Sequence, residues 1–403
     1  MLNFPNHFLL PAIPQTFFGA GSIQKLPAAI LAYGKRVLII TGKRSFTTSQ
    51  QWSSLSHAME ASFITWEIAH ISGEPSPTQV DAIVQQFHDA HIDVVVGIGG
   101  GSALDAAKAI AGLLPHGNSV MDHLEGVGNN IPYSGISTPL IAIPTTAGTG
   151  SEASKNSVLS QRGEHGFKKS FRHDALVAKL AIIDPELLYS CPRSRIASNG
   201  MDAFVQLLES YLSKSATPFS DALAWSGLQA FAASFSPLME RFDHPCEENT
   251  SHYQAMTYAS FISGITLAQV GLGSIHALAS PIGAYSNMPH GEVCGTLLAV
   301  ATQVNIEHLR QHSSDQALQS LYKYAQVGRL LLGQDHTTSD TQALETLSLR
   351  LEQMVEDLAM PKLSNYGICA ADLQRIATHT GSLQNNPILL QTDQLIEILA
   401  RRL

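Results

Sequence analysis

The sequence predicts a two-domain protein, with an N-terminal α/β domain built on a doubly wound parallel sheet and an all-α C-terminal domain. Three observations support this fold class. The chain has 403 residues, more than the roughly 250–300 at which a single hydrophobic core stops growing. Its first half alternates β-branched runs with helical patterns, which is typical of parallel strands joined by crossover helices. Its second half shows helical periodicity almost to the end.

The expected strands of the first half are short apolar runs. They lie at 36–42, 62–70, 93–101, 139–146 and 179–185. Helical spacing separates them, over 78–91 and again from Ser102, where the sequence is rich in Ala and Leu. This alternation predicts that the strands are parallel and that helices connect them.

The expected helices of the second half follow one another without a strand-like run between them. They lie at 200–213, 217–237, 253–285, 292–310, 315–332, 341–358, 370–381 and 392–402. Pro185 and Pro192 interrupt the chain where the pattern changes, so we place the boundary near 186–196. The sequence thus predicts an α/β domain over 1–190 and a helical domain over 191–403.

Composition excludes several classes of partner. Apolar residues make up 44% of the chain, charged residues 14%, and the net charge is −9 without a stripe of Lys or Arg. These values argue against binding to nucleic acid or to an anionic membrane. No apolar stretch reaches the ~18–20 residues of a membrane span, and three prolines break the N-terminus, which makes it a poor signal peptide. Four scattered cysteines suit reduced thiols, so we expect a cytoplasmic protein.

Two glycine-rich loops point to a dinucleotide. GIGGGSALDAAKA (97–109) joins a strand to a helix, where backbone amides and the helix N-terminus attract a pyrophosphate. PTTAGTGSE (144–152) is a second such loop directly after a strand. A purely structural turn is the alternative for the first loop alone. The expected cofactor-binding residues of the two loops are Gly99, Gly100, Gly101, Ser102, Asp105, Thr145, Thr146 and Thr149.

The first strand bears on which dinucleotide binds. An acidic residue after such a strand would hydrogen-bond the ribose 2′-hydroxyl and repel a 2′-phosphate. Here Gly42 ends the strand and Lys43 and Arg44 follow it. Space together with positive charge favours NADP(H) over NAD(H). A basic surface turn is the alternative interpretation.

A divalent metal site is indicated by two segments of the second half. In the helix expected over 200–213, Asp202, Gln206 and Glu209 share one face, because residues three and four apart stack together. Taken alone, this stripe reads as the wet side of a surface helix. His276 and His290 lie in a segment rich in Gly, Ala and Ser, and two imidazoles with one carboxylate make a plausible ligand set.

Several long motifs together resemble one known family. They are GGGSALDAAKA, PTTAGTGSE, IIDPELL, GMDA and GxxHALAxPxGAxxxxPHG. The chain resembles the iron-containing (group III) alcohol dehydrogenases over nearly its whole length, from FFGAGS to NNPILL. The resemblance implies a dehydroquinate-synthase-like fold, with NAD(P) on the N-terminal domain and a divalent ion in the interdomain cleft, held by one Asp and three His. It also implies that Lys168 reaches the ribose.

The family's ligand set is carried over with one loss. The Asp is Asp202, and two of the histidines are His276 and His290. The third histidine is replaced by Gln206, and a further family histidine linked to proton transfer is Ser280 here. Three readings of Gln206 remain open: a weak fourth ligand, a group that orients a water, or the mark of a metal-free site. Glu209 is expected to be structural.

The predicted activity is an NAD(P)-dependent interconversion of a small alcohol with its aldehyde or ketone. Fe²⁺ or Zn²⁺, held by the catalytic residues Asp202, His276 and His290 with Gln206, would polarise the carbonyl, and reduced nicotinamide would deliver hydride. By resemblance the protein is a homodimer. Two alternatives stay open: a metal-free carbonyl reductase of the same fold, and a dehydroquinate-synthase-like lyase that uses NAD transiently.

Overall fold

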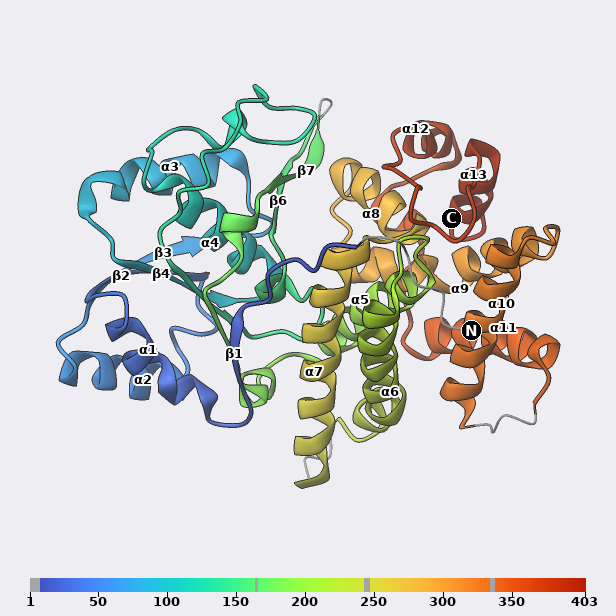
Figure 1. Ribbon diagram of the computed structural model, residues 1–403, viewed down its shortest axis with the longest axis horizontal. Helices are drawn as coiled ribbons and strands as arrows, with labels where there is room; N and C mark the ends of the chain where they lie inside the picture. Colours follow the sequence, from blue (N-terminus) through green and yellow to red (C-terminus); the bar gives the residue numbers. More distant parts are fainter. Residues whose placement is uncertain (1–7, 164–165, 243–246, 334–337) are drawn as a thin grey trace. The chain divides into compact units, whose positions relative to one another are not determined.

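The structure, a computed structural model, describes residues 8–163, 166–242, 247–333 and 338–403 (Figure 1). The chain divides into two compact units. The α/β unit is Leu10–Cys191, and the helical unit is Pro192–Leu403, with which residues 8 and 9 are grouped. The division lies one residue beyond the boundary expected between 190 and 191.

A six-stranded parallel sheet forms the centre of the α/β unit. Its strand order is β1-β8-β5-β4-β2-β3. The strands are β1 Gln15–Phe18, β2 Arg36–Gly42, β3 Thr65–Ile71, β4 Val94–Gly99, β5 Leu140–Pro144 and β8 Leu180–Ile183. All five expected strands are confirmed, with β3 shifted toward the C-terminus. The edge strand β1 was not expected, because its four residues are half exposed and carry no apolar run.

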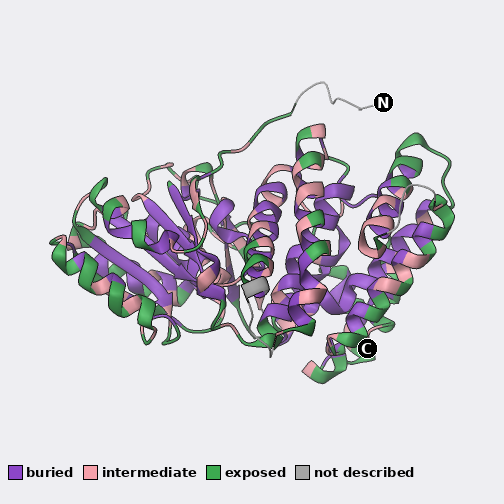
Figure 2. Ribbon diagram, turned by 90° about the horizontal axis from the view of Figure 1, so that it is seen from below, coloured by how far each residue is buried: buried purple, intermediate pink, exposed green. Residues whose placement is uncertain are grey.

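Helices cover both faces of this sheet, as the alternating pattern requires. On one face, α1 (Leu26–Leu31) and α2 (Gln50–Ala61) share a core with Val37 and Ile39 of β2. On the other face, α3 (Pro77–Phe87) and α4 (Gly101–Leu113) share a core with Leu38 and Ile40. Successive residues of β2 are therefore buried on opposite sides. Figure 2 shows the strands of the sheet coloured mainly as buried.

An antiparallel hairpin, β6 (Asn156–Gln161) and β7 (Phe167–Arg172), adds to the α/β unit. Leu159 and Phe171 of the hairpin are fully buried in the same core as α4. The sequence did not predict this hairpin, since one side of β7 carries Lys168, Ser170 and Arg172, and Lys169 interrupts the other side between Phe167 and Phe171.

The helical unit contains helices and no strand within its described residues. They are α5 Arg193–Leu212, α6 Pro218–Glu240, α7 Glu247–Val270, α8 Ser274–Tyr285, α9 His290–Leu309, α10 Asp315–Leu332, α11 Asp340–Asp357, α12 Leu373–Thr378 and α13 Thr392–Ala400. The unit is built around α5, which packs against α6, α7 and α9 (Figure 1).

The segment expected as one helix over 253–285 is two helices. Gly271 adopts a φ of +67°, a conformation that favours glycine, and the chain bends by 98° between α7 and α8. Among the described residues no single helix is long and apolar enough to cross a membrane, although this bent pair meets that test by length and composition. The break places His276 in the first turn of α8.

Candidate active site

The polar stripe of α5 lies in the interior of the helical unit. Every residue of α5 from Gly200 to Leu212 is buried. Asp202 is 1% exposed, Gln206 3% and Glu209 6%. Since buried carboxylates and amides are costly unless they are paired, the stripe is not the wet side of a surface helix.

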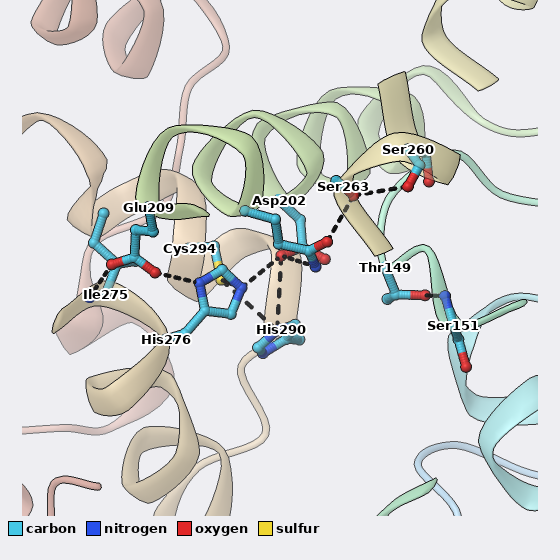
Figure 3. Close-up of polar contacts among 11 residues, drawn as sticks. Thr149, Ser151, Asp202, Glu209, Ser260, Ser263, Ile275, His276, His290 and Cys294 are labelled. Carbon is cyan, nitrogen blue, oxygen red and sulfur yellow. Dashed lines mark hydrogen bonds and ion pairs between the residues drawn. The ribbon is translucent and has the colours of Figure 1, made fainter. Parts of the chain in front are cut away.

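Asp202 lies at the centre of a cluster formed by three helices (Figure 3). Its Oδ1 is 3.3 Å from Nε2 of His276 on α8 and 3.7 Å from Nε2 of His290 on α9. Cys294 completes the cluster, with its Sγ 3.7 Å from Nε2 of His276 and 3.8 Å from Nε2 of His290. One ligand atom of each residue lies within 4.8 Å of the others. Carboxylate oxygen, imidazole nitrogen and thiolate sulfur are the donors that zinc and related ions take in proteins, so this set fits a divalent ion.

Glycines bring α9 close enough to α5 to form the cluster. Pro289 precedes α9, and His290 and Cys294 are four residues apart, so they share one face of that helix. A Cβ on Gly291 would lie 2.5 Å from the carbonyl oxygen of Ser198, and one on Gly295 would lie 3.2 Å from Cβ of Met201. Larger residues at either position would push α9 away from the carboxylate.

Gln206 contacts Asp202 through its nitrogen. Its Nε2 donates to Oδ1 of Asp202 at 3.3 Å, and its Oε1 accepts from the hydroxyl of Ser263 on α7 at 2.7 Å. The oxygen is the only atom of this amide that can bind a cation, and in this structure it accepts from a hydroxyl. The contacts therefore suit a group that orients the Asp202 carboxylate.

Glu209 holds both the start of α8 and the ring of His276. One carboxylate oxygen accepts from the backbone N–H of Ile275 at 2.7 Å, and the other lies 2.7 Å from Nδ1 of His276. A Nδ1–H donated to Glu209 leaves Nε2 of His276 directed at the cluster, which is how metal-binding histidines are commonly oriented. The expected structural role of Glu209 thus includes a direct contact with a candidate ligand.

A buried amide network also fixes the first turn of α8. The Oδ1 of Asn386 accepts from the backbone N–H of Ser274 at 3.0 Å. Its Nδ2 donates to Oδ1 of Asn305 at 2.8 Å and to the carbonyl of Ile388 at 2.7 Å. The NNPILL motif near the C-terminus therefore supports the helix that carries His276. Ser280 lies one turn further along α8.

The electrostatics of the cluster follow from burial and close opposite charges. Burial would raise the pKa of Asp202, but the His290 and His276 imidazoles hold it below its ordinary value. Burial would lower the pKa of His276, yet Cys294, Asp202 and Glu209 together hold it well above the ordinary value. Burial raises the pKa of the Cys294 thiol to about 12.

In the α/β unit, the two glycine-rich loops meet at the carboxyl ends of neighbouring strands. Gly99 of β4 pairs with Pro144 of β5, and the N–H of Thr145 donates to the Gly99 carbonyl at 2.9 Å. A Cβ on Gly100 would lie 3.1 Å from Oγ1 of Thr146. A Cβ on Gly101 would lie 2.8 Å from Oγ1 of Thr149. Only glycine allows the threonine loop to approach the N-terminus of α4 this closely.

Two other expected cofactor residues contact the protein itself. The carboxylate of Asp105 accepts from the Ser151 hydroxyl at 2.5 Å and from the N–H of Val158 at 3.1 Å, and it lies 3.0 Å from Nζ of Lys108. Asp105 therefore ties α4 to the threonine loop and to β6. Lys168 on β7 forms an ion pair with Glu74, with 2.6 Å between Nζ and Oε1. Ser102 lies in the first turn of α4.

Gly42 faces open space at the end of β2. A Cβ there would meet no atom within 4 Å, and Lys43 and Arg44 after it are exposed. A Cβ on Gly99 would lie 3.8 Å from the nitrogen of Gly42, so this strand end borders the first glycine-rich loop. The open space that we expected beside Gly42 is therefore present in the structure.

Sequence reasoning did not single out Cys294 or Ser263. Cys294 lies one helical turn after His290, and that spacing was the available signal, but a lone cysteine on an apolar helix usually belongs to the core. Ser263 lies on α7, 57 residues from its partner Gln206. Nothing in the local sequence links the two.

Comparisons with known proteins agree with the motifs. Residues 14–185 match the family model described as iron-containing alcohol dehydrogenase, and residues 196–403 match the C-terminal model of the Fe-containing alcohol dehydrogenase family. A long-chain-alcohol dehydrogenase of Geobacillus thermodenitrificans is 30% identical over 369 residues, which is 90% of this chain and 87% of the relative.

Solved structures confirm the predicted two-domain fold. An iron-containing alcohol dehydrogenase from Thermotoga maritima is 26% identical with a TM-score of 0.79, and the match covers 98% of this chain and 99% of the other. A sulfoacetaldehyde reductase from Bifidobacterium kashiwanohense, solved in complex with NAD⁺, is 25% identical with a TM-score of 0.80. That match covers 97% and 98% of the two chains.

Proposed function

The chain belongs to the iron-containing alcohol dehydrogenase family and is an NAD(P)-dependent oxidoreductase of alcohols and aldehydes, and we propose that it works on a small substrate with NADPH and a divalent ion. The observation that carries the proposal is the convergence of Asp202, His276 and His290 in a buried cluster. Nε2 of each imidazole lies within 3.7 Å of the same carboxylate oxygen. Apolar side chains at these positions would stabilise the fold at least as well, so a buried cluster of ionisable side chains points to a function.

The glycine-rich loops bind the cofactor in this proposal. The backbone amides of Gly99, Gly100 and Gly101 and the positive end of α4 hold the pyrophosphate. Thr145, Thr146 and Thr149 line the path of the adenosine and nicotinamide, and Lys168, which is paired with Glu74 in this structure, would leave that partner to reach the ribose. We also assign Asp105 and Ser102 to the cofactor-binding residues. The contacts of Asp105 with Ser151 and Lys108 support a role in holding the two loops together around the cofactor.

NADPH is the proposed cofactor because of the end of β2. A 2′-phosphate needs room and positive charge, and an acidic side chain there would repel it. The open space beside Gly42 and the exposed side chains of Lys43 and Arg44 supply both.

Asp202, His276 and His290 would hold the ion, Fe²⁺ or Zn²⁺. When bound, the ion acts as a Lewis acid on the carbonyl while reduced nicotinamide supplies hydride. Glu209 keeps Nε2 of His276 facing the ion by accepting from Nδ1. The His290 side chain is 27% exposed and that of Asp202 1%, so the substrate approaches from the side of His290.

Proton transfer differs from the family pattern. Ser280 stands where the family has a histidine, and a hydroxyl can relay a proton but does not store one near neutral pH. The substrate oxygen would therefore take its proton from water on reduction, and release it to water on oxidation, through the Ser280 hydroxyl or directly.

The test combines metal analysis with turnover. Protein purified without chelator is assayed for oxidation of NADPH with a series of short and long aldehydes, before and after removal and return of Zn²⁺ or Fe²⁺. We expect activity to follow the ion content, and His276→Ala to lose both. Activity that survives chelation and His276→Ala would instead favour a metal-free carbonyl reductase of the same fold.

The second alternative is a lyase that uses NAD transiently, as dehydroquinate synthase does. Such an enzyme returns its cofactor to the oxidised state in each turnover. A substrate converted without net change in NADPH absorbance would support the lyase. Net oxidation of NADPH in proportion to the alcohol formed supports the reductase.

The expected assembly and location remain predictions. We propose a homodimer in the cytoplasm, in line with the family resemblance and the low fraction of charged residues. Light scattering at micromolar concentration tests the first: a mass of 43.3 kDa, that of one chain, would contradict it.

A further inference from the structure

We propose that Cys294 supplies the fourth protein ligand in place of the missing histidine, so that the site binds zinc in preference to iron through Asp202, His276, His290 and Cys294. The inference rests on the proposed metal site and goes beyond it, because the family resemblance gives no role to this cysteine. Gln206, in this arrangement, orients Asp202 and is not a ligand.

The spacing of the donor atoms fits one ion. Sγ of Cys294 lies 3.7 Å from Nε2 of His276 and 3.8 Å from Nε2 of His290, and those nitrogens lie 3.3 Å and 3.7 Å from Oδ1 of Asp202. Ligands at zinc distances of about 2.0–2.3 Å and tetrahedral angles are separated by about 3.3–3.6 Å. These four separations are therefore within a few tenths of an ångström of those around one ion, and one ligand atom of each of the four residues lies within 4.8 Å of the others.

The direction of the Cys294 side chain supports this assignment. Cys294 is 0% exposed, and its sulfur faces both ring nitrogens that bear on Asp202 (Figure 3). A cysteine that only filled the core would be expected among apolar side chains. Cys294 instead contacts two imidazoles, which are costly to bury unless they have partners. Its position one turn after His290 puts two donors on the same rigid face of α9.

The contacts of Gln206 support the same assignment of ligands. Its oxygen accepts from Ser263 and its nitrogen donates to Asp202, and an amide nitrogen cannot coordinate a cation. The helix α5 thus presents one ligand, Asp202, and α9 presents two. The number of donors is the same as in the family, but one has moved from α5 to α9.

The exchange of imidazole for thiolate changes the preferred ion. Thiolate is a soft ligand that favours zinc, whereas harder oxygen and nitrogen sets accept iron and magnesium more readily. The inferred site therefore binds Zn²⁺, and Co²⁺ as a spectroscopic substitute, more tightly than Fe²⁺.

Cobalt substitution tests the proposal without reference to activity. The full chain is stripped of metal and titrated with Co²⁺. A thiolate ligand gives a near-ultraviolet sulfur-to-cobalt charge-transfer band, which we expect at one ion per chain. Cys294→Ser should abolish the band and weaken Zn²⁺ binding more than about 100-fold, beyond the ~10–100-fold typical of groups that only orient a ligand. Gln206→Leu should keep the band.

Cys369→Ser is the matched control, because Cys369 is exposed and lies outside the cluster; its band should equal that of the unaltered protein. X-ray absorption of the unaltered zinc protein needs no variant and should show one sulfur at about 2.3 Å. Cobalt bound without the band, and zinc without sulfur, would overturn the role of Cys294 while leaving the metal site in place. No cobalt bound at all would overturn the proposed metal function as well.

Discussion

The carboxylate of Glu209 lies 2.7 Å from Nδ1 of His276 and caps the backbone N–H of the residue before it. One side chain on α5 thus sets both the position and the orientation of a ring on α8. The carboxylate is 6% exposed, so little water competes for either contact. Binding of an ion by Nε2 of His276 is therefore linked to a residue that does not touch the ion.

Substitution of Glu209 is expected to weaken metal binding. Glu209→Gln replaces an oxygen acceptor with a donor on one side, so either the His276 ring or the Ile275 N–H loses its partner. We expect zinc affinity to fall about 10–100-fold, as for other partners of metal-binding histidines. Competition with a chromophoric chelator measures the change. The exposed Glu307→Gln on α9 makes the same change in charge and should have no effect; equal losses would point to long-range charge alone.

Gly42→Asp is expected to reverse the cofactor preference. The new carboxylate enters open space at the end of β2, where it repels a 2′-phosphate and can accept from a ribose 2′-hydroxyl. We expect NADPH affinity to fall by about tenfold or more and NADH to bind at least as well as before. Fluorescence titrations with both nucleotides measure this. Gly42→Ala adds bulk without charge and should leave the order intact. If the unaltered protein already binds NADH more tightly, the basis of the prediction is wrong.

Glu152 is expected to make stability fall as the pH rises. Burial raises the pKa of this carboxyl to about 7, and Lys108 opposes the shift only in part. Between its ordinary pKa of about 4.5 and about 7, the unfolded chain loses the proton while the folded chain keeps it. Stability is then complete below about pH 4.5 and is lost up to about pH 7, by about 3 kcal/mol in total.

Glu152→Gln tests that slope, since the amide stays neutral. Urea unfolding at about pH 5 and about pH 8 should show the variant gaining most over the unaltered protein at the higher pH, by about 3 kcal/mol. Glu60→Gln, on the exposed side of α2, serves as the control. A constant difference between the two pH values would show that Glu152 is ionised throughout.

The fold could be predicted where burial leaves a plain pattern. The strands β2, β4, β5 and β8 are covered on both faces, so they read as continuous apolar runs. The edge strand β1 and the hairpin of β6 and β7 have one face open to water, and their polar residues concealed them. The break between α7 and α8 was missed because apolar residues continue on either side of Gly271.

The site could be predicted only as far as its motifs extend. Asp202, His276 and His290 stand in recognisable local sequences, whereas Cys294 becomes a candidate only when α8 and α9 bring both imidazoles to its sulfur. The contact of Glu209 with His276 depends on the turn before α8, which a continuous helix would not have formed. The contacts of Cys294 and of Glu209 both depend on how the helices pack in three dimensions, which the local sequence pattern does not reveal.

The last prediction concerns Gln206 and Cys294 together. Gln206→His restores the imidazole of the family on a helix that already directs Asp202 at the cluster. Alone, this substitution is expected to raise affinity for zinc or iron, with the larger gain for iron because imidazole is a harder ligand than thiolate. Activity need not rise, since Ser280 still replaces the neighbouring histidine and an added donor can occupy the position that a substrate requires.

The decisive comparison places Gln206→His in the Cys294→Ser background. If the cysteine is the fourth ligand, the single Cys294→Ser variant binds zinc poorly, and adding Gln206→His returns the affinity to within about tenfold of the unaltered protein. The cobalt band of a thiolate should stay absent, because nitrogen and not sulfur now completes the set. Gln206→Leu in the same background supplies no donor and should not rescue binding. If Gln206→His and Gln206→Leu each rescue binding, then removal of the Gln206 amide, and not addition of a ligand, restores zinc affinity. Rescue by neither would mean that position 206 on α5 cannot reach the ion, and that the histidine lost from this chain cannot simply be put back.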